Sequence, residues 1–220
     1  MDHVSVDSLA GLPEVLGQAG FPGGAGVLVV VGGASGMSEA HRETSDAVLR
    51  EVVIPFVAAA GIAVVDGGTD AGVMRALGLA RAALRAEFPL VGVAAQGTLG
   101  SAVLEPHHTH LVSVPGEKWG DESPWLFDVA GVIANEAPVA TLVVNGGEVT
   151  LGDVAHSLLR GIPIVVLGGT GRAADRITDA RTGPGDPWVT FVARSPLTHL
   201  VNVGHRDELR RVLRGVLGLG

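Results

Sequence analysis

Four apolar segments of this sequence end in a pair of glycines, a pattern that suits the binding of an anion through the main chain. The pairs are Gly32 with Gly33, Gly67 with Gly68, Gly146 with Gly147, and Gly168 with Gly169. A phosphate can approach the backbone closely where no Cβ is present, and the free N–H groups at the start of a following helix attract negative charge. One pair alone also fits an ordinary tight turn. Four of them predict a shared anion site built from backbone.

The most specific spacing follows the last of these pairs. Gly169, Gly171 and Ala174 match the pattern G-x-G-x-x-A at an expected junction of strand and helix. Arg172 stands inside this segment, where it can clamp a phosphate or lie in solvent as a surface arginine. The pattern is incomplete as a dinucleotide fingerprint, because it follows the fifth expected strand and no acidic residue ends a strand at the right spacing. No loop contains Gly-Lys-Ser/Thr, which disfavours a P-loop nucleotidase.

Residues beside the glycine pairs extend the candidate site. Ser35 does not stand in a Gly-x-Ser-x-Gly elbow, so we expect its hydroxyl to donate a hydrogen bond to phosphate rather than to act as a nucleophile. With the paired glycines and Arg172, the residues expected to hold the ligand are Ala34, Ser35, Gly36, Thr69, Gln96, Gly97, Thr98, Asn145, Thr170 and Gly171.

Histidine and lysine bear on metal and cofactor chemistry. His107, His108 and His110 follow Pro106, but no carboxylate stands at a regular helical spacing from them. We therefore expect these side chains to pack and hydrogen-bond within a loop, and we predict no metal site. The chain has one lysine, Lys118, and no cysteine. A Schiff-base cofactor, a disulfide and a thiolate metal site are not expected, and no cofactor is predicted.

Two tryptophans, Trp119 and Trp125, flank the acidic residues Asp121 and Glu122. An indole can stack on a nucleotide base. It can also pack a loop onto the body of the protein, because aromatic side chains bury a large area. The sequence leaves both interpretations open.

The elements that must position these residues follow from the hydrophobic pattern. Continuous β-branched runs predict strands that are covered on both faces, and we expect them at residues 28–33, 63–68, 90–97, 142–147 and 164–169, with a short last strand at 200–203. Apolar residues at helical spacing predict helices at residues 46–60, 71–86, 122–135, 149–160, 172–181 and 207–217. Pro55 predicts a kink in the first of these helices.

Strands that alternate with helices predict an α/β fold. We expect a Rossmann-like, doubly wound and mainly parallel sheet with helices on both faces. All strand carboxyl ends then meet at one edge, which brings the glycine pairs together. Residues 98–121 and 182–198 break the regular spacing, and a long irregular segment in a compact domain is often functional. No linker is evident, so one domain over residues 1–220 is expected.

Composition excludes several classes of protein. There are 33 glycines among the 220 residues, without a collagen-like period, whereas glycine averages about 7%. Apolar residues make up 47% and charged residues 17%, which excludes a disordered chain. The net charge of −8 and the scattered arginines argue against a nucleic-acid partner. The uncharged stretch 52–65 is too short to span a membrane, and no secretory signal begins the chain. We expect a cytoplasmic protein with no membrane partner.

The ordered set of motifs resembles the SLOG superfamily. It comprises the Gly32 pair, residues 66–74, 96–98 and 105–110, the Gly146 pair and residues 169–175, and it covers roughly residues 25–180. Within that superfamily, the motifs resemble the cytosolic amino-terminal domain of melastatin-type (TRPM) channels and their stand-alone prokaryotic relatives. The resemblance implies a Rossmann-like sensor that binds nucleotide-derived ligands such as ADP-ribose. It also implies that residues 169–172 hold phosphates beside the loop from Gly32 to Gly36.

The same superfamily contains phosphoribohydrolases that activate cytokinins, and their Pro-Gly-Gly-x-Gly-Thr-x-x-Glu signature can be laid over residues 145–153. Asn145, Val149 and Asp153 depart from it. Cleavage of an N-glycosidic bond needs a carboxylate near the ribose, and Asp153 or Glu148 is the candidate. We therefore expect a protein that binds or senses an ADP-ribose-like or NAD-derived molecule. The alternative is hydrolysis of a nucleoside 5′-monophosphate. Apolar helices allow a homo-oligomer.

Overall fold

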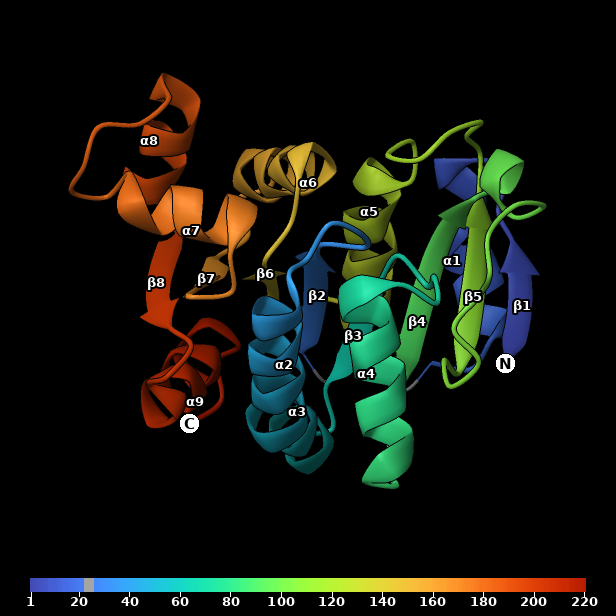
Figure 1. Cartoon of the computed structure of the whole chain (residues 1–220). Coiled ribbons are helices and arrows are strands. Elements are labelled where there is room, and N and C mark those ends of the chain that lie inside the picture. Colours follow the sequence, from blue (N-terminus) through green and yellow to red (C-terminus); the bar gives the residue numbers. More distant parts are fainter. Residues whose placement is uncertain (22–25) are drawn as a thin grey trace.

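One parallel sheet carries the fold of residues 1–21 and 26–220, which are the residues that the computed structural model describes. Within them, eight strands are hydrogen-bonded in the order β1-β5-β4-β3-β2-β6-β7-β8, and every neighbouring pair is parallel (Figure 1). The strands are β1 Asp2–Ser5, β2 Val27–Gly32, β3 Ala63–Asp66, β4 Leu90–Ala95, β5 His110–Val114, β6 Val139–Val144, β7 Ile164–Gly168 and β8 Thr198–Asn202.

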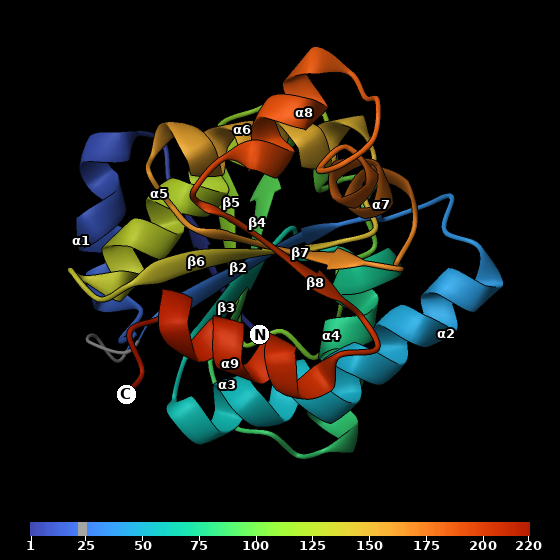
Figure 2. The ribbon, with the colours of Figure 1, turned by 90° about the vertical axis from the view of Figure 1, so that its left-hand side faces the viewer.

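Helices cover both faces of the sheet, as Figure 2 shows with the sheet seen along its edge. One face packs against α1 Leu12–Gln18, α5 Ser123–Ala134, α6 Glu148–Leu159, α7 Arg172–Asp179 and α8 Pro187–Arg194. The other packs against α2 Glu39–Val48, α3 Ile54–Ala60, α4 Gly72–Ala83 and α9 Arg206–Val216. The α/β, Rossmann-like fold expected from the sequence is confirmed.

Strand β2 shows why the apolar runs are continuous. Val27, Val29 and Val31 belong to the core beneath α5 and α6, whereas Leu28 and Val30 belong to the opposite core, beneath α4. Successive side chains of a strand point to opposite faces, so a strand with two cores needs an apolar residue at every position.

The chain reverses its direction across the sheet at β2. From β2 it proceeds through β3, β4 and β5 on one side, and β6, β7 and β8 then lie on the other side. In an open parallel sheet, such a reversal leaves a crevice outside the carboxyl ends of the strands on either side of it. The loops after β2 and β6, which carry two of the glycine pairs, border that crevice.

The helix expected at residues 46–60 differs from the prediction in its start and its continuity. It begins at Glu39, where the Ser38 hydroxyl oxygen accepts a hydrogen bond from the His41 N–H at 3.3 Å. A π-helical turn, Leu49–Val53, separates α2 from α3. Pro55 follows as the second residue of α3. Proline has no N–H to donate within a helix, so the irregular turn falls directly before it.

Two regular elements lie in segments that were expected to be irregular. Strand β5 crosses residues 98–121, where Leu111, Val112 and Val114 are buried between β4 and β1. Helix α8 lies in residues 182–198 and is capped by Asp186, whose carboxylate accepts from the Trp188 N–H at 2.8 Å. The last strand begins two residues earlier than predicted, at Thr198. Elements β1 and α1 were not predicted.

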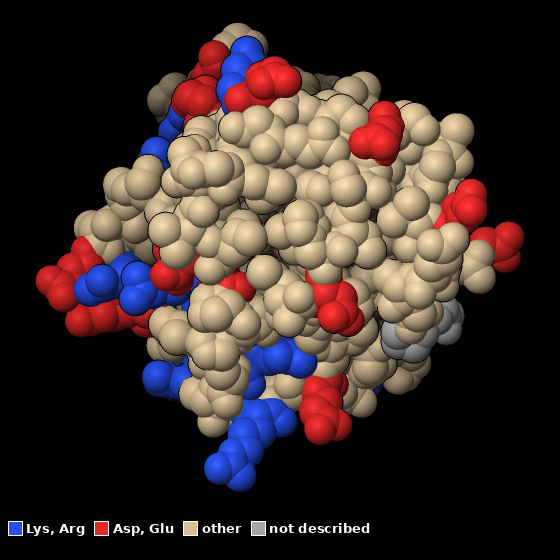
Figure 3. All heavy atoms as spheres, turned by 90° about the vertical axis from the view of Figure 1, so that its right-hand side faces the viewer, with Lys and Arg blue, Asp and Glu red and all other residues tan. Residues whose placement is uncertain are grey.

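Charge is sparse on the face beside the β1 edge of the sheet. Figure 3 shows this face as mostly uncharged, with scattered acidic residues and with basic residues gathered toward one rim. In the parts of the chain that the structure describes, no helix combines the length and the hydropathy that a membrane crossing requires.

Candidate functional site

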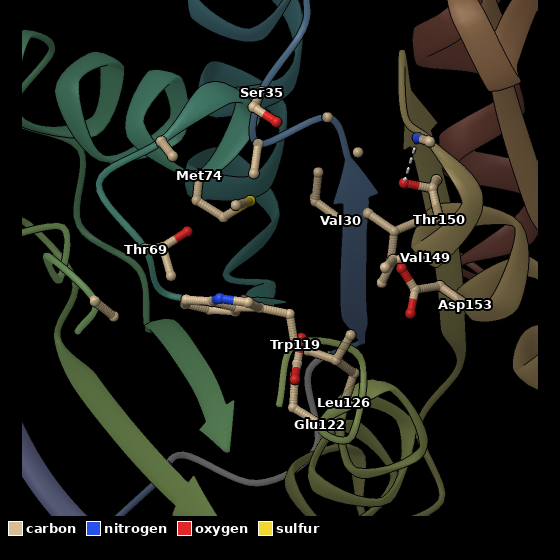
Figure 4. Close-up of a pocket in the computed structure, with 18 of the residues that line it drawn as sticks. Val30, Ser35, Thr69, Met74, Trp119, Glu122, Leu126, Val149, Thr150 and Asp153 are labelled. Atoms are coloured by element: carbon tan, nitrogen blue, oxygen red, sulfur yellow. Dashed lines mark hydrogen bonds between the residues drawn. The ribbon is translucent and has the colours of Figure 1, made fainter. Parts of the chain in front are cut away.

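A pocket of about 640 Å³ lies at the crevice beside β2. Its walls come from the ends of β2 and β3, the starts of α4, α5 and α6, and two loops, residues 101–103 and the segment that carries Trp119. Figure 4 shows side chains from these elements converging on one space. Ligand pockets typically measure about 300–1,000 Å³, so the space is large enough for a nucleotide-sized molecule.

The structure brings about half of the predicted site residues to this pocket. The predicted residues that line it are Gly32, Gly33, Ala34, Ser35, Gly67, Thr69, Gly147 and Arg172, together with both candidate acids, Glu148 and Asp153. The predicted residues that do not line it are Gly36, Gly68, Gln96, Gly97, Thr98, Asn145, Gly146, Gly168, Gly169, Thr170 and Gly171. Most of this second group supports the pocket from behind.

Asn145 ties the loops after β6 and β7 together beneath the pocket. Its N–H donates to Thr170 Oγ1 at 2.8 Å, and its Nδ2 donates to the Thr170 carbonyl oxygen at 2.6 Å. The N–H groups of Ala173 and Ala174, in the first turn of α7, donate to the carbonyl oxygens of Gly146 and Asn145. The Gly169 N–H donates to Asp175 Oδ1 at 2.6 Å. Three backbone N–H groups of the G-x-G-x-x-A segment, those of Gly169, Ala173 and Ala174, are thus bonded within the protein. Of the residues in this segment, Arg172 lines the pocket.

Gly97 lies against the segment that carries Trp119, whereas Gln96 donates from Nε2 to Ser5 Oγ at 3.0 Å. The Gly97 N–H donates to the carbonyl oxygen of Gly116 at 2.8 Å, and the Thr98 hydroxyl donates to the Ala95 carbonyl at 2.8 Å. Gly116, after which the Trp119 segment begins, is therefore held by a hydrogen bond to the residues that follow β4.

Arg172 supplies the cation of the site. Its Nη1 donates to the carbonyl oxygen of Ser35 at 2.6 Å, and its guanidinium lies against Gly36 and Gly147. Arg172 therefore joins the loop after β2 to the start of α6. Its backbone has φ of 53°, a left-handed conformation that is uncommon for a residue with a side chain.

Glycine is required where these loops meet α4. A Cβ added to Gly72, which has φ of +49°, would lie 1.7 Å from the carbonyl oxygen of Gly33. The Val73 N–H donates to that same oxygen at 3.1 Å. At the start of α6, Gly147 is the N-cap residue, and its N–H donates to Thr150 Oγ1 at 3.2 Å (Figure 4). The helix starts thus lie directly against the pocket, which gives this end a positive potential.

The other end of the pocket is acidic and apolar. Asp153 is 5% exposed, and its Oδ1 is buried without a hydrogen-bond partner. Burial raises the pKa of Asp153 to about 7; a hydrogen bond from the Ser123 hydroxyl opposes this rise, and the nearby charge of Glu122 adds to it. Burial also raises the pKa of Glu122. Glu148 is different, because its carboxylate is exposed and accepts from Arg176 at 3.0 Å.

Trp119 projects from a segment that is held by its own acidic residues. Asp121 Oδ2 accepts from the N–H groups of Glu117 and Lys118 at 2.9 and 3.2 Å, and Glu122 Oε2 accepts from the Gly120 N–H at 2.9 Å. Trp119 lines the pocket and is 52% exposed. Trp125 instead packs against the core beneath α5. The two tryptophans that the sequence left undecided therefore lie in different environments.

The histidine segment forms a buried ionic cluster behind another wall. His108 Nε2 is 2.8 Å from Asp66 Oδ1, and its Nδ1 is 2.8 Å from Glu105 Oε2. His107 Nδ1 contacts the other oxygen of Glu105 at 2.6 Å. Among the residues that the structure describes, no group of three or more His, Asp or Glu side chains is arranged to hold a metal ion. The cluster holds residues 105–108 against Asp66 at the end of β3.

Sequence reasoning did not single out several pocket residues. Glu122, Met74 and Val103 line the pocket. Glu122 had a usable signal, because it stands three residues after Trp119 at the expected start of a helix. Met74 ends the 66–74 motif but was not assigned to the site. Val103 had no signal, since an apolar side chain does not reveal whether it faces a core or a cavity.

Comparisons with known proteins bear on the family and the fold of the chain. A family model described as "SLOG in TRPM, prokaryote" matches residues 25–210. The mouse transient receptor potential cation channel subfamily M member 2 is 23% identical over an alignment of 203 residues, and the match covers 72% of this chain and 13% of the channel. This chain thus spans a small part of that relative. The solved structure of the molybdenum cofactor carrier protein from Chlamydomonas reinhardtii has a TM-score of 0.60 at 15% identity, covering 88% of this chain and 99% of that one.

The resemblance that the motifs predicted is therefore confirmed. Because the family model covers most of the sequence, the chain belongs to the family described as SLOG in TRPM, prokaryote.

Proposed function

We propose that this protein binds or senses a nucleotide-derived small molecule of the ADP-ribose or NAD type in the pocket beside β2. The observation that carries the proposal is that Arg172 joins the loop after β2 to the start of α6 in the same pocket that exposes Trp119. A guanidinium between two glycine-rich loops suits a phosphate, and an exposed indole suits a base.

The chemistry of the two ends matches such a ligand. Helix starts and Arg172 provide positive potential at one end without a basic protein surface, which fits the net charge of −8. Apolar side chains, among them Met74, Val30 and Leu126, line the pocket as well and provide a surface for a base or sugar. The fold neighbour is a molybdenum cofactor carrier protein, and a small-ligand carrier with this fold accords with the proposal.

Titration calorimetry with ADP-ribose, NAD, cyclic ADP-ribose and AMP tests the proposal. We expect at least one of them to bind below millimolar concentration. Arg172→Gln should weaken that binding at least tenfold, since a hydrogen bond to a charged group contributes about 1.5–3 kcal/mol. Arg176→Gln is the matched control, because Arg176 lies on the same helix and pairs with Glu148 at 3.0 Å. If none of the four binds below millimolar, the proposal fails.

Hydrolysis of a nucleoside 5′-monophosphate is the second candidate, and Asp153 favours it. A carboxyl group with a pKa of about 7 can donate a proton at neutral pH, as the departure of a base requires. Incubation of AMP with the protein, followed by chromatography, should then show adenine and ribose 5-phosphate. Asp153→Asn should abolish the release of base, whereas Glu148→Gln should not. The absence of adenine from the wild-type reaction rejects the candidate.

A further inference from the structure

Two carboxyl groups from different elements face the same end of the pocket. Asp153 belongs to α6, and Glu122 directly precedes α5; both line the pocket. Figure 4 shows the two side chains on either side of the space beside Leu126, well apart from Ser35. Glu122 is close enough for its charge to raise the pKa of Asp153.

Asp153 Oδ1 is an acceptor without a donor. The residue is 5% exposed, and the oxygen has no partner among the described residues. Buried polar atoms in native proteins are nearly always paired, and an unpaired one calls for an explanation. Because the side chain also lines the pocket, a ligand that enters the pocket can provide the missing donor.

Among the described residues, no basic side chain forms an ion pair with Asp153 or Glu122. The charged groups on the elements that pack against α6 are Glu117, Lys118, Asp121 and Glu122 before α5, Asp128 within it, and Arg172, Asp175, Arg176 and Asp179 on α7. Arg172 is engaged with Ser35, Arg176 with Glu148, and Asp128 with Arg160 at 2.9 Å. Strands β2, β6 and β7 carry no charged residues. The partner that fits two carboxyl groups in an apolar end is therefore a neutral group with several donors.

The distance along α6 indicates which part of a nucleotide would lie near Asp153. Asp153 stands six residues after the N-cap Gly147, and a helix rises about 1.5 Å per residue, so the two are separated by about 9 Å along the axis. A phosphate at the start of α6 would place the sugar that carries it, rather than a second phosphate, toward Asp153.

We propose that Asp153 and Glu122 form a subsite that reads the adjacent hydroxyl groups of the ligand's sugar, with one hydroxyl donating to Asp153 Oδ1 and its neighbour to Glu122. The inference rests on the proposed function, because it takes the phosphate to bind at Arg172 and the start of α6. It assigns Glu122 a role in recognition and defines the ligand as one with a free vicinal diol.

The experiment compares AMP with 2′,3′-dideoxy-AMP, which differ only in the two hydroxyl groups. Wild-type protein should bind AMP at least tenfold more tightly, which is the effect of losing a hydrogen bond to a charged group. Asp153→Asn and Glu122→Gln should each reduce this preference several-fold, while the affinity for 2′,3′-dideoxy-AMP stays nearly constant. Asp128→Asn removes an acidic residue of α5 outside the pocket and should leave the preference intact.

The outcomes separate this inference from the proposed function. If AMP and 2′,3′-dideoxy-AMP bind wild type equally well, the pocket binds nucleotides and the carboxyl subsite is overturned. If a clear preference survives in both variants, other groups read the hydroxyls, and the subsite is again overturned. If neither nucleotide binds and ADP-ribose also fails to bind, the proposed function falls and the subsite with it. Circular dichroism of both variants verifies that they are folded.

Discussion

The imidazole Nε2 of His108 lies 2.8 Å from Oδ1 of Asp66, and neither side chain is exposed. The second ring nitrogen lies 2.8 Å from Glu105 Oε2. Ionised carboxylates only accept hydrogen bonds, so both ring nitrogens carry a proton and His108 is a buried cation between two anions. Asp66 Oδ1 also accepts from the Gly68 N–H at 2.7 Å. The ion cluster therefore sets the course of the loop after β3, which lines the pocket at Gly67 and Thr69.

Replacing His108 should destabilise the protein strongly. His108→Phe keeps most of the volume but leaves two carboxylates buried without their partner, and removal of one member of a buried ion pair costs about 3–5 kcal/mol. His107→Asn is the control, because His107 contacts the same Glu105 from a partly exposed position and should cost much less. Urea unfolding at pH 6 measures both. Equal, small effects would show that the cluster contributes little to stability.

The contribution of His108 should also depend on pH. Burial alone would lower the pKa of His108, but the charges and hydrogen bonds of Asp66 and Glu105 raise it to about 10. A raised histidine pKa stabilises the fold fully below the ordinary value of about 6.5, and this stabilisation is lost as pH rises through 10. The stability difference between wild type and His108→Phe should therefore be larger at pH 6 than at pH 10. A difference that is the same at both pH values would contradict a buried imidazolium.

Much of the fold could be predicted because the strands at the centre of the sheet are apolar at nearly every position. Runs such as Val27 to Val31 are typical of strands that are covered on both faces, and the glycines after them mark the strand ends. Strand β5 escaped prediction because His110 and Ser113 interrupt its apolar pattern and three histidines stand before or within it. Its strand character comes from hydrogen bonds to β4 and β1, which are contacts between residues distant in sequence.

The sequence predicts which edge of the sheet carries the candidate site, but it does not predict which single residues line the pocket. Glycine pairs identify which loops converge, but Asn145 and Thr170 bond to each other and so turn one predicted binding loop into a support. Glu122 reaches the pocket only because α5 and α6 pack side by side. Such pairings depend on the assembled layers, and no local sequence pattern encodes them.

Gly72→Ala should damage the junction between the loop after β2 and α4. The new Cβ would overlap the carbonyl oxygen of Gly33 in a left-handed backbone conformation, and overpacking with backbone strain costs about 2–4 kcal/mol. Gly131→Ala is the matched control in helix α5, because nothing lies within 4 Å of the added Cβ. It should stabilise by about 0.5–1 kcal/mol. Thermal unfolding measures the stability of both variants. If Gly72→Ala is as stable as wild type, the junction can accommodate the added Cβ.

Trp119→Ala should weaken the binding of nucleotides that carry a base. Stacking of a base on an aromatic side chain contributes about 1–3 kcal/mol, so AMP affinity should fall by tenfold or more, whereas ribose 5-phosphate should bind as before. Trp188→Ala, which removes an exposed indole from α8, should change neither. Calorimetry with both ligands decides the matter. An equal loss for AMP and ribose 5-phosphate would mean that Trp119 shapes the pocket without contacting the base.

Asp153→Asn should stabilise the unliganded protein, and more so at higher pH. Burial raises the pKa of Asp153 to about 7, so the stability that this group provides in its protonated form is fully present below about pH 4 and is lost as pH rises through 7. Asparagine cannot ionise, and the stability of the variant relative to wild type should therefore grow by about 2–4 kcal/mol between pH 4 and pH 8. Glu148→Gln, an exposed position on the same helix, controls for the loss of a negative charge. Denaturant unfolding at the two pH values tests the expectation. A variant that is equally destabilised at both would show that the ionised carboxylate supports the fold, in which case Asp153 is not the unpaired acid of the pocket.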